Sequence, residues 1–326
     1  MKSAGEILAK SPKLSKLRSL AVPLTRAQEK LLDIATAIRL DPGKFEAAFL
    51  ARELVQCTLP HTNPGNVPVW KRRNGNFTLG IVPGLNIETG KSYGYPYGTI
   101  PRLLLFWITT EAVRTKNRRL ELGHSLAYFM RDLGLDPNTG GGKRGDARRL
   151  QEQMRRLFKS TMSFQRTIEE DHRHGEQWLD MQVAPKGELW WDPKHPEQGA
   201  LWGSYIILGE DFFNALVAFP VPVDMRILRA LKRSPLALDL YAWVTWRVFK
   251  TQKPTFIPWV GLMEQVGSEY GNVKDFKRKA KAALRKILAV YPGLKLEWRS
   301  GGFTLHPSPT SVPALPAAAA QKKLAQ

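Results

Sequence analysis

The feature that most constrains the fold is an order of predicted elements that occurs twice along the chain. Each copy opens with a strongly apolar helix that begins at proline, whose missing N–H would be unpaired at that position anyway. A short amphipathic helix and a longer basic helix follow. These elements begin at Pro101, Ser125 and Asp146 in the first copy, and at Pro235, Trp259 and Asn272 in the second. Two strands close each copy, MSFQRTIE with QWLDMQVA and LKLEW with FTLHP.

This order of helices and strands is that of a winged helix-turn-helix, whose last helix enters the major groove of duplex DNA. The hairpin, or wing, lies beside that helix and contacts the DNA backbone or the minor groove. We therefore predict an α+β fold of two tandem winged helix-turn-helix domains related by a weak internal duplication. The predicted segments are a basic, flexible N-terminal arm, winged-helix domains 1 and 2, and a disordered C-terminal tail, at residues 1–22, 23–198, 199–308 and 309–326.

The charge of the chain predicts a polyanionic partner. Its 49 lysines and arginines exceed its 29 aspartates and glutamates, which gives a formal charge of +20. Such an excess indicates nucleic acid or an anionic membrane. A membrane is disfavoured, because the longest apolar run, residues 103–108, is much shorter than the roughly 18–20 residues that span a bilayer. With no secretory signal and a single cysteine, Cys57, we expect a cytoplasmic, bacterial protein without disulfides.

The second basic helix separates its charges from its apolar side. Asn272 is the predicted N-cap, with Asp275 in a capping-box position. The apolar stripe is Phe276, Ala280, Ala283, Leu284, Ile287 and Leu288. The predicted DNA-binding residues here are Lys274, Lys277, Arg278, Lys281 and Arg285, with Arg299 in the hairpin. A solvated helix usually mixes the two signs of charge, so DNA contact is favoured and a solvated charge run is the alternative.

The first basic helix follows the glycine-rich stretch NTGGGKRG. Its predicted core stripe is Leu150, Met154, Leu157 and Phe158. The pattern leaves outside Lys143, Arg144, Arg148, Arg149, Arg155, Arg156 and Lys159, together with Gln151 and Gln153. Arginine can bind guanine through two hydrogen bonds, and glutamine can bind adenine in the same way. Arg148 and Gln151 occupy the N-terminal half, where base contacts usually lie, and lysines are expected at phosphates.

Sequence motifs for catalysis are weak throughout the chain. GGGK is not a phosphate-binding loop, because Arg144 follows Lys143 where serine or threonine is required. His172 and His174 resemble a metal-binding pair, but Arg173 between them indicates a solvated turn. Tyrosines 93, 95 and 97 have no metal motif nearby. We therefore expect no catalytic residue, no metal and no cofactor.

Two stretches resemble the RepA-type family of plasmid replication initiators. They are LELGHSLAYFMRDLGLDPNTGGGKRGDARRLQEQMRRLFKSTMSF, and SYIILGEDFFNAL continuing through PVPVDMRILRALKRSPLALDLYAWVTWRVF. The resemblance covers roughly residues 25–308, and residues 146–159 and 272–286 match the two reading helices of the family. The glycine- and proline-rich segment 60–98, with one predicted strand at Phe77–Val82, departs from the family pattern.

The resemblance implies binding to direct repeats, called iterons, in double-stranded DNA of a plasmid origin. It further implies local melting of AT-rich DNA and recruitment of the host initiator, replicative helicase and primase. It implies control of copy number and repression of the protein's own gene, with a homodimer as repressor and a monomer in replication.

Two other functions stay open from the sequence. The first is a winged-helix transcription repressor or partition protein. The second is a strand-nicking replication enzyme or a primase. Direct repeats beside the gene favour the initiator, whereas a single palindrome favours the repressor.

Overall fold

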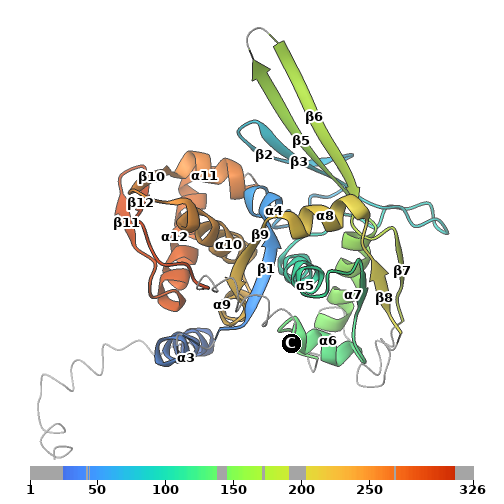
Figure 1. Ribbon diagram of the computed structural model, residues 1–326, viewed down its shortest axis with the longest axis horizontal. Helices are drawn as coiled ribbons and strands as arrows, with labels where there is room; N and C mark the ends of the chain where they lie inside the picture. The colour runs from blue at the N-terminus through green and yellow to red at the C-terminus, as the bar shows by residue number, and fades with distance from the viewer. Residues whose placement is uncertain are drawn as a thin grey trace, which may run out of the picture.

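The computed structural model describes residues 25–41, 43, 45–137, 145–170, 173–190, 203–267 and 269–312. Two antiparallel strands, β1 (Ala47–Ala51) and β9 (Pro220–Asp224), lie near the middle of the molecule, with a group of helices on each side (Figure 1). Helices and antiparallel sheets occur together throughout, so the predicted α+β class is confirmed.

The first helix group consists of α5 (Thr99–Thr115), α6 (Leu126–Asp132) and α7 (Asp146–Phe158). The hairpin of β5 (Thr161–Glu170) and β6 (Arg173–Gln182) follows it, which confirms the predicted order. Ser125 caps α6, because its hydroxyl accepts the Tyr128 N–H at 3.1 Å. One detail is wrong: α5 begins at Thr99, two residues before Pro101.

The second helix group consists of α10 (Pro235–Lys250), α11 (Trp259–Val266) and α12 (Val273–Val290). The hairpin of β11 (Leu296–Arg299) and β12 (Gly302–Leu305) follows, and β10 (Thr255–Pro258) pairs with β12 as a third strand. Pro235 is the first residue of α10, as predicted, and Ser234 is its N-cap. Asn272 caps α12 by accepting the Asp275 N–H at 2.9 Å, also as predicted.

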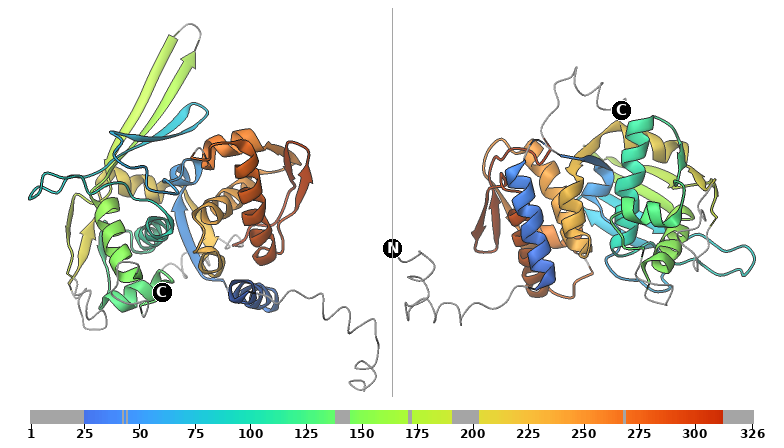
Figure 2. Two further views of the ribbon diagram at one scale, coloured as in Figure 1. Left: turned by 180° about the vertical axis from the view of Figure 1, so that it is seen from behind. Right: turned by 90° about the horizontal axis from the view of Figure 1, so that it is seen from below.

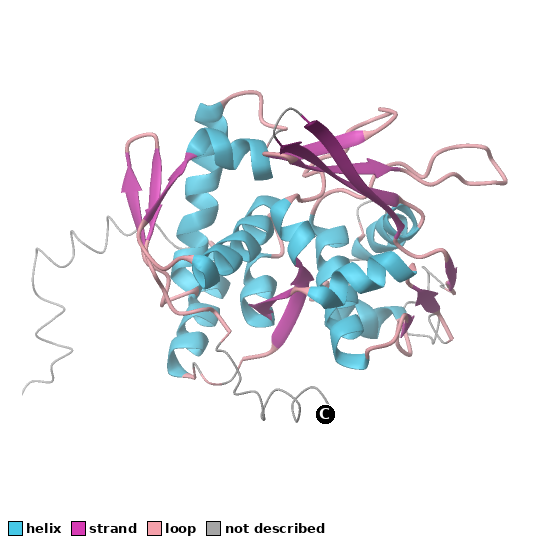
Figure 3. Cartoon of the chain, turned by 45° about the horizontal axis from the view of Figure 1, so that its top comes forward, coloured by secondary structure: helices cyan, strands magenta, loops and turns pink. Residues whose placement is uncertain are grey.

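The glycine- and proline-rich segment contributes two strands rather than one. The predicted strand is β3 (Phe77–Val82), and β2 (Trp70–Asn74) pairs with it. Together with β5 and β6 they form a four-stranded sheet, whose long hairpin projects beyond the helices (Figures 1 and 3). A smaller sheet joins β4 (Arg119–Glu121), β8 (Tyr205–Ile207) and β7 (Lys186–Glu188).

Contacts cross the predicted boundary between residues 198 and 199 in both directions. From the first half of the chain, α3 (Arg26–Leu40) packs on α12 and on α9 (Met225–Leu231), beside which it runs in Figure 2. From the second half, α8 (Glu210–Ala218) packs on α5, β1 and β6. The short helix α4 (Arg52–Gln56) continues β1 and contacts α10. The two helix groups are therefore tied together by exchanged elements.

A single hydrophobic core runs through both helix groups. In α5 every side chain from Ile100 to Thr109 is buried, as expected for a helix that is apolar on all sides. The core also reaches the end of the described chain, where Val312 is buried and the Tyr291 hydroxyl donates to the Pro309 carbonyl at 2.6 Å. The expectation of a disordered tail is therefore wrong for residues 309–312, while residues 1–24 and 313–326 lie outside the described part. No helix within that part is long and apolar enough to cross a membrane.

Candidate nucleic-acid interface

Helix α12 presents its cations away from the core. Phe276, Ala280 and Leu284 are fully buried against the neighbouring helices. Lys274, Arg278 and Arg285 are exposed, and Lys277 and Lys281 are partly exposed. Of these five cations, only Arg278 forms an ion pair within the helix, with the carboxylate of Asp275 at 3.6 Å. Lys279 and Lys286, which the sequence analysis did not select, are also exposed and add charge on one flank.

The hairpin after α12 is held against the cationic side of that helix. Nζ of Lys281 lies 5.1 Å from the centre of the Trp298 ring, within range of a cation–π interaction. Trp298 in turn stacks on Trp259 of α11, with ring centroids 6.2 Å apart. Arg299 is exposed beside the turn of the hairpin and pairs with Glu297 at 2.9 Å. The hairpin therefore lies beside the cations of the helix, and Arg299 adds a further exposed cation near its turn.

Helix α7 has the same construction. Ala147, Leu150, Met154, Leu157 and Phe158 are buried. The predicted residues Arg148, Arg149, Arg155 and Lys159 are exposed, and Gln151 is partly exposed. Arg149 bends toward Asp146 in the first turn of the helix, with 3.2 Å between the guanidinium and the carboxylate. Lys143 and Arg144 lie outside the described residues.

Two predicted outward residues of α7 instead hold the loop that precedes α5. Gln153 is buried, and its side-chain oxygen accepts the Tyr97 N–H at 2.9 Å, so its predicted outward position is wrong. Arg156 is only 12% exposed, pairs with Glu152, donates to the Tyr95 carbonyl at 3.3 Å and lies over the Tyr97 ring. Its geometry supports a positioning role, and its DNA contact stays a prediction.

A buried ionic cluster joins the two helix groups behind this surface. The Asp239 carboxylate in α10 accepts two hydrogen bonds of 2.7 Å from Arg102 in α5 and one of 2.8 Å from His61. Burial alone would raise the pKa of Asp239, but Arg102 and His61 outweigh it and hold that pKa well below its usual range. Arg102 also donates to three backbone carbonyls, those of Leu59, Pro60 and Gly98.

A second, partly buried ion pair continues the cluster to the start of α12. Arg72 of β2 is buried and contacts Glu269 at 2.6 Å, three residues before the N-cap Asn272. The other carboxylate oxygen of Glu269 accepts a hydrogen bond of 2.7 Å from the backbone N–H of His61. The sequence of β2 does not predict that Arg72 forms a buried ion pair, because its partner Glu269 is 197 residues away in the sequence.

The described residues offer little for nucleophilic or metal chemistry. No group of histidine, cysteine and carboxylate side chains among them could hold a metal ion. Tyr95 is buried, and its hydroxyl donates to the Val67 carbonyl at 2.7 Å. Burial raises the pKa of the Cys57 thiol to about 12, so this thiol stays protonated at neutral pH. The chemistry that the described surface supports best is binding of an anion by helix-borne cations.

Comparisons with known proteins show that part of the chain is similar to a protein family. Residues 95–256 match the family model described as plasmid encoded RepA protein. One solved structure, that of domains 2 and 3 of RctB, is similar at 12% sequence identity, covering 77% of this chain and 94% of that chain with a TM-score of 0.47. No curated protein gives a significant match. The match runs from the lead into α5 to the second residue of β10, and it confirms the resemblance to RepA-type plasmid replication initiators seen in the sequence.

Proposed function

We propose that the chain initiates plasmid replication by binding direct repeats in duplex DNA through α7 and α12. Each helix group with its hairpin then forms one winged helix-turn-helix domain. The observation that carries this proposal is the repeated construction of the two helices. In both, the apolar side is buried and arginines and lysines are exposed opposite the core, beside a hairpin. Cations so placed can neutralise phosphates and reach base edges in a major groove.

In this proposal the protein acts by binding and not by catalysis. Bound to adjacent repeats, it strains neighbouring AT-rich DNA toward melting and recruits the host initiator, helicase and primase. A second copy of the chain takes part when the protein represses its own gene. The family match supports the initiator role, and the iterons, the host partners and the homodimer belong to the proposal alone.

A footprint of the purified protein on the DNA beside its own gene tests the proposal. We expect protection of several direct repeats, each about 20 bp long because two reading helices need two half-sites about one helical turn apart. A plasmid that carries these repeats and the gene should replicate in a host that otherwise cannot maintain it. The same plasmid with a frameshift in the gene is the control. Protection of a single palindrome, without plasmid maintenance, would support the repressor instead.

A further inference from the structure

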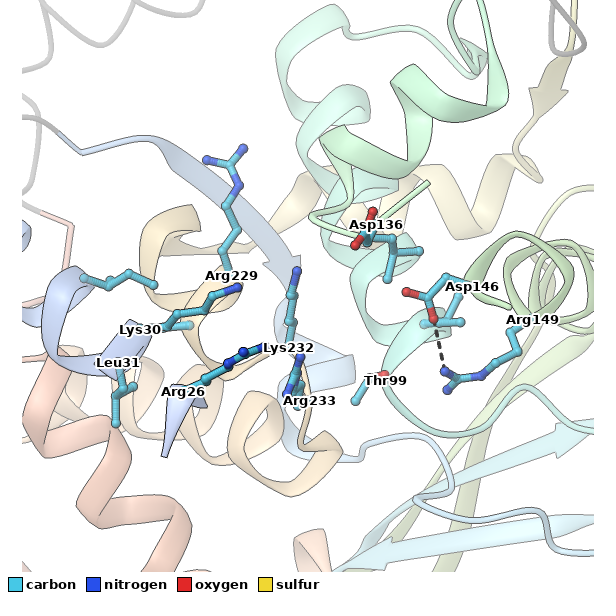
Figure 4. Close-up of a pocket in the computed structure, with 14 residues that line it drawn as sticks. Arg26, Lys30, Leu31, Thr99, Asp136, Asp146, Arg149, Arg229, Lys232 and Arg233 are labelled. Atoms are coloured by element: carbon cyan, nitrogen blue, oxygen red, sulfur yellow. Dashed lines mark hydrogen bonds and ion pairs between the residues drawn. The ribbon is translucent and has the colours of Figure 1, made fainter. Parts of the chain in front are cut away.

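A basic cleft of about 750 Å³ lies between the N-terminal end of α7 and the helices α3 and α9. One wall comes from α3 and α9, and the other from the N-terminal end of α7 and the turn after α6 (Figure 4). No residue of α12 lines the cleft, but α3, which forms part of its wall, packs on α12. Six of the lining side chains are cationic: Arg26, Lys30, Arg149, Arg229, Lys232 and Arg233.

The cleft has more cationic side chains than carboxylates to pair with them. The acidic lining residues are Asp136 and Asp146, and Asp146 already pairs with Arg149. Arg229 pairs with Glu46 at 2.7 Å. Among the described residues, Arg26, Lys30 and Arg233 have no carboxylate within ion-pair distance. Like charges gathered at one place repel each other, so the cleft is stabilised when an anion enters it.

Lys232 is the cleft cation whose ionisation this environment alters. Its ammonium is half-buried, and it donates to the Gly134 carbonyl across the cleft. Burial lowers the pKa of Lys232, and Arg233 and Lys30 lower it further, while the carboxylates of Asp146 and Asp136 partly oppose this. A bound anion would raise this pKa, because it favours the charged form of the lysine.

We propose that this cleft binds backbone phosphates of the duplex where the DNA passes between α7 and α12. This inference rests on the proposed function and adds to it a phosphate site that lies outside both reading helices. The lining residues favour a sugar–phosphate backbone over a nucleotide. Their apolar members are Leu31, Ile34, Ile100, Leu135 and Ala230, and no aromatic ring among the lining residues could stack a base.

The test uses Lys30→Gln and Arg233→Gln in the full chain, singly and together. Both side chains are exposed, so their replacement leaves the core intact. The matched control is Arg39→Gln, which removes the same charge from α3 about two and a half turns beyond Lys30, on the opposite side of the helix and outside the cleft. Binding to a protected repeat and to random duplex is measured as a function of salt concentration, together with interference by phosphate ethylation.

Each single variant should lower the slope of log affinity against log salt by about 0.9, and the double variant by about 1.8. Ethylation of phosphates midway between the two half-sites should inhibit the wild type and lose its effect in the double variant. Slopes equal to that of Arg39→Gln, with duplex binding otherwise intact, would overturn the cleft proposal and leave the proposed function standing.

Two further outcomes are decisive. Stabilisation of the wild type by ATP or inorganic phosphate, absent in the double variant and without a change in DNA slope, would assign the cleft to a small anion and overturn the proposal. Failure of the wild type to prefer any repeat beside its gene would remove the proposed function and the cleft proposal with it.

Discussion

At the scale of single residues, the fold depends on a charged side chain in the core, Asp239. Its carboxylate is buried, yet it stays ionised because Arg102 and His61 surround it. Removing one member of such a buried pair leaves the other charge without compensation, which is more destabilising than the loss of an exposed pair. The Asp239 cluster also joins α5 to α10, so its loss acts on both helix groups.

Asp239→Asn should therefore lower the free energy of unfolding by about 3–5 kcal/mol, because Arg102 is left buried without its counter-charge. Urea unfolding followed by circular dichroism measures this change. Asp33→Asn on the exposed side of α3 is the matched control and should change the stability by less than about 0.5 kcal/mol. Equal effects of the two substitutions would show that the buried pair does not stabilise the fold.

The same cluster predicts how stability depends on pH. Burial lowers the pKa of His61 from its ordinary 6.5 despite the hydrogen bond to Asp239, so the folded protein keeps this ring neutral. The unfolded chain takes up the proton below about pH 6.5, and stability should fall as the pH falls through that value. Asp239 adds a further loss below its ordinary pKa of 3.8. Urea midpoints between pH 4 and 8 test this sign, and a protein that gains stability on acidification from pH 7 to 5 would refute it.

At the scale of elements, local signals could be predicted and distant partners could not. The caps Ser125, Ser234 and Asn272 act within three residues, so the sequence alone locates the starts of α6, α10 and α12. Gln153 follows the polar pattern of α7 but is buried, because its partner is the backbone of Tyr97 in another segment. The periodicity of a helix cannot predict a hydrogen-bond partner that lies in another segment of the chain.

The two candidate reading helices allow a prediction that separates base contacts from phosphate contacts. Arg148 is exposed in the N-terminal half of α7, and Arg285 is exposed in the C-terminal half of α12. Arg148→Ala should weaken binding to the cognate repeat by about 1–3 kcal/mol and change binding to random duplex little. Arg285→Ala should weaken both alike and lower the salt slope by about one. Competition assays on the two DNAs measure this, and an equal loss on both for Arg148→Ala would exclude it from base recognition.

At the scale of the whole molecule, the repeated order of elements was predictable, but the way in which the two copies are joined was not. The strand pair β1–β9, the packing of α3 on α12 and the Arg102–Asp239 pair all connect residues more than 130 positions apart. No short-range pattern encodes such pairings, and the predicted boundary at residue 198 reflects only the order of elements. The contacts instead hold the two helix groups in one relative orientation, which favours binding as a unit.

This joined architecture predicts a strict spacing of the half-sites. Docking of the second helix is intramolecular once the first is bound, so the affinity of the whole chain can exceed that of one group by about 10²–10⁴. Inserting about 5 bp between half-sites turns the second major groove to the far side of the duplex, since one helical turn is about 10–10.5 bp. Electrophoretic mobility assays should then show the loss of that gain in affinity.

A second insertion distinguishes a rigid connection from a flexible one. Adding about 10 bp restores the groove to the same side but moves it about 34 Å along the axis. With α3 packed on α12 and β1 paired with β9, the second helix group cannot follow that displacement, so affinity should stay low. Recovery at 10 bp would indicate a flexible connection between the groups. Unchanged affinity at 5 bp would mean that one reading helix binds per chain, as expected for the repressor.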